Sequence, residues 1–373
     1  MAPRFEVPVG PQAIPPTMAG HLPFVSVIMP VFRSARDLLT EALDALCRVD
    51  YPRDRYEVLV VDNDVDGRGE LEHLVAAYAP SVRYVRSPQK GAHSARNYGL
   101  IQARGEYCYF VDDDIVVDPQ SLRTLAHALA AEDVGGVGGK IHPIWRDRTP
   151  PNWIRLFLDS TYVVGDDYRR VLEAAGVSEG NERLNLGLLS LLDLGDDAMD
   201  VDEGWLYSCH LMVKRSAALS AGGFGPDLLG RYALGDNEMS LLRNIIQSGL
   251  RLRYEPRAVV AHVIPSRRLT MGYLAQRTFN DGACDSYIQL RTGRVRGTGA
   301  VVSALFNRAG RAVGSIAAIV ATAGGREGRW RLAFTTLCTN VGAAHYYATY
   351  LISSRRRVLV HWPNYLDALA HGR

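Results

Sequence analysis

Residues 107–119 constrain the fold of this chain more than any other stretch of the sequence. They begin with the aromatic and β-branched run 107–111, whose composition is typical of a buried strand. Three carboxylates, Asp112, Asp113 and Asp114, follow directly. Adjacent carboxylates raise one another's pKa unless a cation lies among them, and hard oxygen ligands suit Mn²⁺ or Mg²⁺. The stretch therefore predicts a strand that ends at a divalent-metal site, with a turn of solvated aspartates as the alternative.

Composition limits the class of protein. The 373 residues are 47% apolar and 22% charged, with a net charge of +2, which gives no indication of a nucleic-acid partner. Five scattered cysteines without a CxxC pair argue against a disulfide framework or a zinc site and favour the cytoplasm. Residues 1–22, rich in Pro and Gly, lack a signal-peptide core and are expected to form a flexible arm. The segment 332–354 carries polar residues that favour a packed helix over a membrane span.

Strands and helices are expected to alternate along the first third of the chain. Apolar runs predict strands at 25–32, 56–61, 82–85 and 107–111, and helical spacing of apolar residues predicts helices at 38–46, 71–78 and 93–104. Nearly unbroken apolar strands joined by helices indicate an α/β fold with a Rossmann-like, mostly parallel central sheet flanked by helices. Ligands bind beyond the carboxyl ends of such strands, so residues 30–32, Asp62 and the three aspartates are expected at one edge.

The second half of the chain is less regular. It contains a glycine cluster at 135–139, an acidic segment at 159–202 expected to be a flexible insert, and predicted strands at 204–214, 250–254 and 258–263. Short helices are expected at 216–221 and after the acidic motif Gly235-Asp236-Asn237-Glu238, the second ending at Gly249. From residue 269 onward the chain is expected to be helical.

Six segments of the chain follow an order known from one protein family. They read VSVIMPVF, VLVVDND, KGAHSARNYGL, YFVDDDIV, HLMVKRSAALSAGGF and LGDNEMSLLRNIIQSGLRLRYEPRAVVAH. Together they cover about residues 24–265 and resemble the family 2 glycosyltransferases, inverting enzymes with the GT-A fold. The resemblance implies a catalytic domain at 23–268, with a nucleotide-binding half at 23–120 and a donor-sugar and acceptor half at 135–268, before a helical region at 269–373.

The resemblance implies a nucleoside-diphosphate sugar as donor, most often a UDP-sugar. The residues expected along the base are Pro30, Val31 and Phe32. Asp62 would accept a hydrogen bond from the base, although Asp-Asn and Asp-Gly also form turns. Lys90 and Arg96 would hold the ribose and phosphates, Arg as a bidentate donor and Lys as a point charge. Either cation could instead lie on the surface.

The three aspartates correspond to the family's DXD motif. On a strand, Asp112 and Asp114 would face the same side, where the resemblance implies that they bind Mn²⁺ or Mg²⁺ while Asp113 lies nearer the ribose. His262 matches a position that often completes the metal site, and a hydrogen-bonded core histidine is the alternative. The ion would neutralise the diphosphate leaving group.

The general base is expected at the acidic motif. Aligned through Arg243 and Gly249, Asn237 falls where the family usually has Asp, and an amide cannot act as a base. Asp236 is the preferred base and Glu238 the second candidate, with helix capping as the alternative role for Asp236. A helix N-terminus stabilises an ionised carboxylate, which weakens it as a base.

Two further regions carry open alternatives. Trp205 and His210 are expected in the donor and acceptor pocket, or in the core. The tail is rich in arginine: Arg267, Arg268, Arg277, Arg291, Arg294, Arg296, Arg308 and Arg311. A solvated basic face is the default for these residues. Peripheral contact with anionic lipid at the inner face of the membrane is the alternative, and a homodimer through the helices is also open.

The sequence therefore predicts a cytoplasmic, metal-dependent inverting glycosyltransferase. It would transfer a sugar to the hydroxyl or amine of a saccharide, a lipid-linked sugar or a small metabolite. A sugar-nucleotide pyrophosphorylase is disfavoured because residues 33–36 lack the glycines of its signature loop. A non-catalytic nucleotide- or carbohydrate-binding protein stays open because of Asn237.

Overall fold

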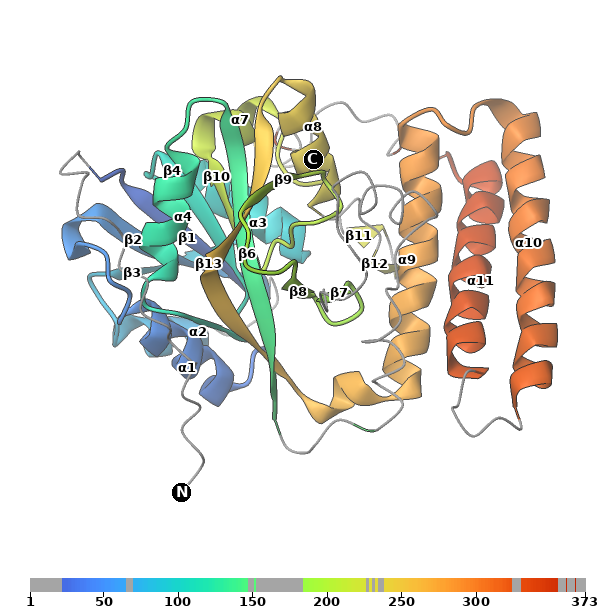
Figure 1. The fold of residues 1–373 in the computed structure, drawn as a ribbon, viewed down its shortest axis with the longest axis horizontal. Helices are drawn as coiled ribbons and strands as arrows, with labels where there is room; N and C mark the ends of the chain where they lie inside the picture. The colour runs from blue at the N-terminus through green and yellow to red at the C-terminus, as the bar shows by residue number, and fades with distance from the viewer. Residues whose placement is uncertain are drawn as a thin grey trace.

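The computed structural model describes residues 22–64, 70–146, 151, 184–225, 228–229, 232–233, 238–323, 330–354, 360 and 366. In this part of the chain, a twisted mixed sheet has helices on both faces, and three long helices stand side by side at one end of it (Figure 1). The predicted α/β class and the helical C-terminal region are confirmed.

The first half alternates strands and helices as predicted. Its elements are β1 (Val25–Val31), α1 (Arg36–Leu46), η1 (Arg53–Arg55), β2 (Tyr56–Asp62), α2 (Glu70–Ala76), β3 (Val82–Arg86), α3 (Ala92–Gln102), β4 (Tyr107–Val111), β5 (Ile115–Val117) and α4 (Ser121–Leu129). β3, β2, β1 and β4 are parallel neighbours in that order. Alternate residues of β1 enter different cores: Val27 and Met29 join Leu43 of α1, and Ile28 joins Leu100 of α3. Burial on both faces explains the unbroken apolar runs.

The second half extends this sheet. Its elements are β6 (Val134–Trp145), β7 (Leu184–Leu186), β8 (Leu191–Asp193), β9 (Met199–Val201), β10 (His210–Lys214), α7 (Arg215–Ser220), β11 (Leu228–Leu229), β12 (Tyr232–Ala233), α8 (Met239–Gln247) and β13 (Arg251–Ile264). The sheet continues from β4 through β10, β6 and β13 to β5, and β10 is antiparallel to both its neighbours. The expectation of a flexible insert is wrong for residues 184–201, which form three short strands; residues 159–183 lie outside the described part of the chain.

The glycine cluster at 135–139 lies in the first half of β6, an element that the sequence did not predict. A Cβ on Gly139 would overlap the Ala258 carbonyl oxygen, and one on Gly138 would stand 2.9 Å from the His210 carbonyl oxygen. Only glycine allows the neighbouring strands to approach this closely. β13 shifts register opposite β6 between Glu255 and Val259 and continues as one strand, where the sequence predicted two.

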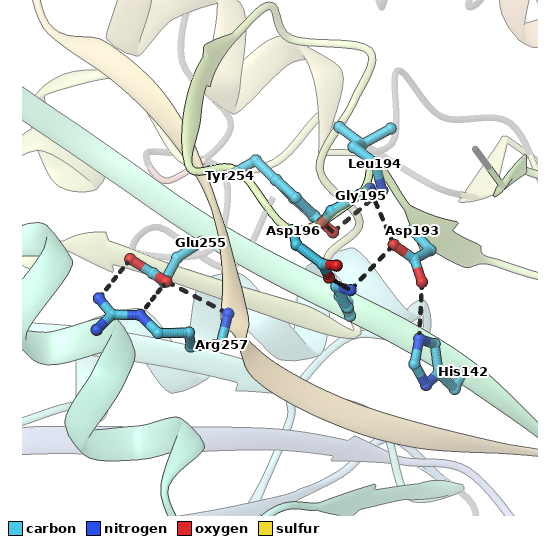
Figure 2. A network of polar contacts seen from close by, with 9 residues as sticks. His142, Asp193, Leu194, Gly195, Asp196, Tyr254, Glu255 and Arg257 are labelled. Atoms are coloured by element: carbon cyan, nitrogen blue, oxygen red, sulfur yellow. Dashed lines mark hydrogen bonds and ion pairs between the residues drawn. The ribbon is translucent and has the colours of Figure 1, made fainter. Parts of the chain in front are cut away.

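Buried and half-buried polar groups attach the segment after β8 to β6 and β13 (Figure 2). Asp193 accepts from the Lys140 ammonium at 3.3 Å and contacts the His142 ring nitrogen Nε2 at 3.1 Å. The Tyr254 hydroxyl donates to the Gly195 carbonyl oxygen at 3.2 Å and accepts from the Leu194 backbone N–H at 3.0 Å. These contacts join strands that are far apart in sequence and fix the segment against the sheet.

After η3 (Ser266–Leu269), the C-terminal helices are α9 (Met271–Arg291), α10 (Gly297–Thr322) and α11 (Trp330–Ile352). α11 lies between α9 and α10 (Figure 1). α9 and α11 meet at Gly282 and Gly342, where an added Cβ would overlap the carbonyl oxygens of Thr339 and Phe279 respectively. The outer side of α10 exposes a stripe of large apolar residues: Phe306, Val313, Ile316 and Val320. None of the described helices is both long enough and apolar enough to span a bilayer.

Candidate active site

Three carboxyl strand ends form the edge where the site lies. β2, β1 and β4 are parallel neighbours, and Val31 stands opposite Asp62 in register. The residues that follow Val31, Asp62 and Val111 therefore meet at one edge, which confirms the prediction made from the alternating pattern.

Asp62 is fixed at this edge by two hydrogen bonds. Its Oδ2 accepts from the Tyr84 hydroxyl at 2.6 Å, and its Oδ1 accepts from the Asp64 backbone N–H at 2.9 Å. The residue is 5% exposed. Each carboxylate oxygen keeps a second lone pair, so Asp62 can still accept from a ligand. Pro30 is buried within β1, and Phe32 just beyond it is 53% exposed.

Gly91 joins this edge to α3. It has φ 122°, in the region that favours glycine, and its N–H donates to Asn63 Oδ1 at 2.8 Å. Lys90, immediately before it, is exposed. Arg96, one turn into α3, is 4% exposed and forms an ion pair with Asp112. The two cations predicted for the phosphates thus differ: Arg96 is buried against the aspartate turn, and Lys90 lies at the surface.

α3 also holds the Gly-Gly-Phe segment after α7. The Asn97 side chain donates to the Phe224 carbonyl oxygen at 2.9 Å and accepts from the Phe224 N–H at 2.8 Å. The His93 ring stacks on the Phe224 ring with centroids 5.5 Å apart, and its Nδ1 lies 3.2 Å from the Gly225 carbonyl oxygen. The Arg96 guanidinium lies 5.8 Å from the centre of the same Phe224 ring. Residues 223–225 are therefore fixed beside Arg96.

The three aspartates form a turn between β4 and β5, so the expectation that Asp112 and Asp114 share one face of a strand is wrong. The strand ends at Val111, and the turn sends Asp112 to Arg96 and Asp114 to Arg268. Asp113 lies between them, and burial together with the charge of Asp114 raises its pKa to about 7.

Asp114 and His262 lie together beneath Arg268. Asp114 Oδ2 accepts from Arg268 Nη2 at 2.9 Å, and Asp114 Oδ1 lies 3.4 Å from His262 Nε2. Arg268 Nη1 lies 2.7 Å from the same His262 nitrogen. Among the described residues, no group of three or more His, Cys, Asp or Glu side chains is gathered as a metal site.

Glu238 lies directly before α8. Its Oε2 accepts from the Ser208 hydroxyl at 3.1 Å. Burial raises the pKa of Glu238, and the positive charges of Arg96 and Arg277 oppose that rise. Asp236, the preferred base in the sequence, lies outside the described residues.

The charges of the aspartate turn and of Glu238 act on one buried thiol, that of Cys209. It is 3% exposed, and burial together with the charges of Asp112, Glu238 and Asp114 raises its pKa well above the usual range. Such an effect requires short distances. Asp112 and Glu238, which are more than a hundred residues apart in sequence, therefore both influence one buried side chain.

Two arginines of the tail lie near the candidate site residues. The default of a solvated basic face is wrong for Arg268, whose side chain is 23% exposed, whereas that of Arg277 is 37% exposed. Arg268 contacts Asp114, and Arg277 of α9 lies 3.3 Å from Asp281 and contributes to the electrostatics of Glu238. Arg277 and Asp281 stand four apart, a spacing at which helical side chains pair. This spacing is the sequence feature from which the pairing of Arg277 with Asp281 could have been predicted.

Trp205 and His210 are core residues in this structure. Trp205 is 8% exposed and belongs to the main hydrophobic core. His210 is 1% exposed; its Nδ1 lies 2.8 Å from the Tyr109 hydroxyl and its Nε2 lies 3.2 Å from the Ala258 carbonyl oxygen. Both observations agree with the core alternative, and a pocket role for these residues stays a prediction.

Residues 26–181 match the family model described as Glycosyl transferase family 2. The matched residues are similar to the family 2 glycosyltransferases. The chain is 36% identical over 126 residues to the glycosyltransferase AglE of Haloferax volcanii, covering 33% of this chain and 41% of AglE. The succinoglycan biosynthesis protein ExoM of Rhizobium meliloti is 24% identical over 250 residues, covering 66% of this chain and 70% of ExoM. The chain thus spans less than half the length of AglE.

One solved structure shares the fold over most of both chains. The mannosyltransferase PcManGT from Pyrobaculum calidifontis, in complex with GDP-Man and Mn²⁺, aligns with a TM-score of 0.53 at 21% identity. The alignment covers 88% of this chain and 88% of that one. The alignment shows that the two proteins share their fold over most of their length.

Proposed function

We propose that this protein transfers a sugar from a nucleoside-diphosphate sugar, a UDP-sugar in the first instance, to an acceptor hydroxyl or amine with inversion. The observation that carries the proposal is the meeting of two sets of residues. Asp62, Arg96 and the aspartate turn lie at one sheet edge, and the charge of Glu238 acts on the same buried Cys209 thiol as the charges of Asp112 and Asp114. A donor held at the edge would have a carboxylate beside its sugar.

The nucleotide is assigned to the ends of β1 and β2. The backbone from Pro30 to Phe32 would lie along the base, and Asp62, held by Tyr84, would accept from a base N–H. Arg96 supplies a buried guanidinium beside the aspartate turn, and Lys90 an exposed ammonium. Both cations suit the diphosphate.

The residues at Asp114 fit a divalent ion. Asp114 Oδ1 is buried and has no hydrogen-bond partner among the described residues, although a buried carboxylate oxygen is costly to leave unpaired. Asp114, His262 and, after movement of its side chain, Asp112 would hold Mn²⁺ or Mg²⁺, and PcManGT is a relative in fold that carries Mn²⁺. A divalent ion held by these residues would supply positive charge to neutralise the leaving diphosphate.

The acidic motif is assigned the proton transfer. Asp236 or Glu238 takes the proton of the acceptor hydroxyl or amine, the acceptor atom bonds to the anomeric carbon, and the bond from that carbon to the diphosphate oxygen breaks. Burial raises the pKa of Glu238, which strengthens it as a base. Arg96 stays beside the departing diphosphate.

A screen of nucleotide sugars tests the proposal. UDP-, GDP- and dTDP-sugars with Mn²⁺ are compared by thermal shift, because a bound donor raises the melting temperature by mass action. Donor hydrolysis or transfer is then measured for wild type, Asp114→Ala, Asp236→Asn and Glu238→Gln. Loss of turnover in Asp114→Ala supports the enzyme, and loss in only one motif variant identifies the base. Tight nucleotide binding without turnover of any donor would instead support a non-catalytic nucleotide- or carbohydrate-binding protein. The family match favours neither that alternative nor a sugar-nucleotide pyrophosphorylase.

The acceptor, the peripheral membrane contact, the homodimer and the cytoplasmic location stay predictions. The observation relevant to the two surface contacts is the apolar stripe on α10, which includes Phe306 and Val320 at 71% and 72% exposure. Exposed apolar surface of this kind is commonly covered by a partner or a lipid surface.

A further inference from the structure

One cation of the chain itself joins the two residues best suited to hold the metal. Arg268 reaches them from η3, beyond the end of β13. Its guanidinium donates to Asp114 Oδ2 at 2.9 Å and lies 2.7 Å from His262 Nε2. Asp114 and His262 are 8% and 3% exposed. A single side chain that enters from outside the sheet therefore engages both.

These contacts fix the protonation pattern. A guanidinium only donates, so His262 Nε2 must accept from Arg268 and the ring proton must be on Nδ1. Asp114 Oδ1 then faces Nε2 at 3.4 Å without a hydrogen between them, and it has no hydrogen-bond partner among the described residues. Two acceptors are thus held side by side, and Arg268 satisfies them only in part.

The same pair suits a divalent ion. Neighbouring ligands of an octahedral Mg²⁺ stand about 3 Å apart, and the separation of Asp114 Oδ1 and His262 Nε2 is 3.4 Å. An ion bound to these two atoms needs the His262 lone pair that Arg268 now uses. The guanidinium and the ion therefore exclude each other at His262.

We propose that Arg268 is an exchangeable internal cation, which pairs with Asp114 and His262 in the metal-free protein and leaves when a divalent ion binds. The inference rests on the metal site proposed above. In the metal-free state Arg268 prevents a buried carboxylate from standing unpaired, which would be strongly destabilising. Once released, its planar guanidinium is suited to bind a phosphate of the donor.

Mn²⁺ binding to the donor-free protein tests this exchange. The amplitude of the EPR signal of unbound Mn²⁺ gives the affinity of wild type, Arg268→Gln, Arg268→Lys and Asp114→Asn. Arg268→Gln is expected to bind about tenfold more tightly than wild type, or about 1.4 kcal/mol. Arg268→Lys is expected between the two, because an ammonium is a point charge without the fork that joins both acceptors.

A matched control separates competition from net charge. Arg267 is the neighbouring residue, carries the same charge and is exposed. Arg267→Gln is therefore expected to bind Mn²⁺ as wild type does. An equal gain in Arg267→Gln and Arg268→Gln would show a general charge effect and overturn the proposal.

A measurement on the wild-type protein covers the case in which Arg268→Gln does not fold. Phenylglyoxal modifies accessible arginines, and the Arg268 peptide is quantified by mass spectrometry. Mn²⁺ is expected to increase the modification of Arg268 about threefold or more, because release from a charge-assisted pair makes the side chain accessible to the reagent. Unchanged or reduced modification, or unchanged Mn²⁺ affinity in Arg268→Gln, overturns the exchange. Retention of wild-type Mn²⁺ affinity in Asp114→Asn would refute the metal site itself.

Discussion

Acidification should destabilise this protein through two buried histidines, and His93 gives the sharper test. His93 is 5% exposed, stacked on Phe224, and close to the charges of Arg96 and Arg277. Burial, and then the charge of Arg96, lowers the pKa of His93 to about 3, and burial lowers that of His210 to about 4. The unfolded chain protonates both near 6.5. Below pH 6.5 the unfolded chain therefore binds more protons at these two positions than the folded chain does, and their contribution to the free energy of unfolding falls as the pH falls.

The magnitude follows from those values. Each pH unit below 6.5 costs about 1.36 kcal/mol per histidine until the folded-state pKa is approached. At about pH 5 each histidine therefore contributes about 2 kcal/mol of destabilisation, or about 4 kcal/mol for His93 and His210 together. That is a large fraction of the stability of an ordinary domain.

Guanidinium chloride unfolding followed by circular dichroism at about pH 7.5 and about pH 5 measures the loss. His93→Gln removes one titrating group and keeps a donor for Gly225, so its loss between the two pH values should be about 2 kcal/mol smaller than that of wild type. His127 is exposed and provides the control. Between the two pH values, His127→Gln should lose as much free energy of unfolding as wild type loses. An equal loss in His93→Gln and wild type would refute the reasoning, since His93 would then titrate alike in both states.

Two further predictions concern the donor site and the helices. Tyr84→Phe removes the hydroxyl that donates to Asp62, and it should weaken UDP binding by about 1 kcal/mol, or about fivefold, in calorimetric titration; unchanged binding would mean that Asp62 does not need this support. Gly342→Ala places a Cβ against the Phe279 carbonyl oxygen and should lower the free energy of unfolding by about 1–3 kcal/mol. Gly314→Ala, in a helix position with nothing within 4 Å, should instead be neutral or stabilising, and a similar loss in both variants would contradict the close approach.

The regular part of the fold could be predicted because local patterns coincide with tertiary burial there. β1, β2 and β4 read as strands since both faces are covered, and their parallel order follows from the intervening helices. β6 could not be predicted, because its glycines have low strand propensity and are required only by atoms of β10 and β13 that lie far away in sequence.

The candidate site likewise has residues that the sequence places correctly and residues that it does not. The order of the predicted elements is enough to place three residues at one edge of the sheet. Asp62 and Asp112 follow predicted strands, and Arg96 lies near the start of a predicted helix. Arg268 and Arg277 follow the last strand in a tail rich in arginine, where composition favours a solvated face. Their place near Asp114 and Glu238 depends on the direction in which α9 leaves the sheet, and no local pattern encodes that direction.

The direction in which α9 leaves the sheet limits how proteins with this fold can change during evolution. The predicted domain boundary at 268/269 falls between Arg268 and α9, and α9 carries Arg277 near Glu238 before it reaches the glycine contact at Gly282. The C-terminal helices are therefore not a separable module appended to a finished enzyme. An evolutionary exchange of these helices between two relatives would also replace Arg277, a cation that acts on Glu238. Substitutions selected for their effect on the C-terminal helices would then also alter the candidate site.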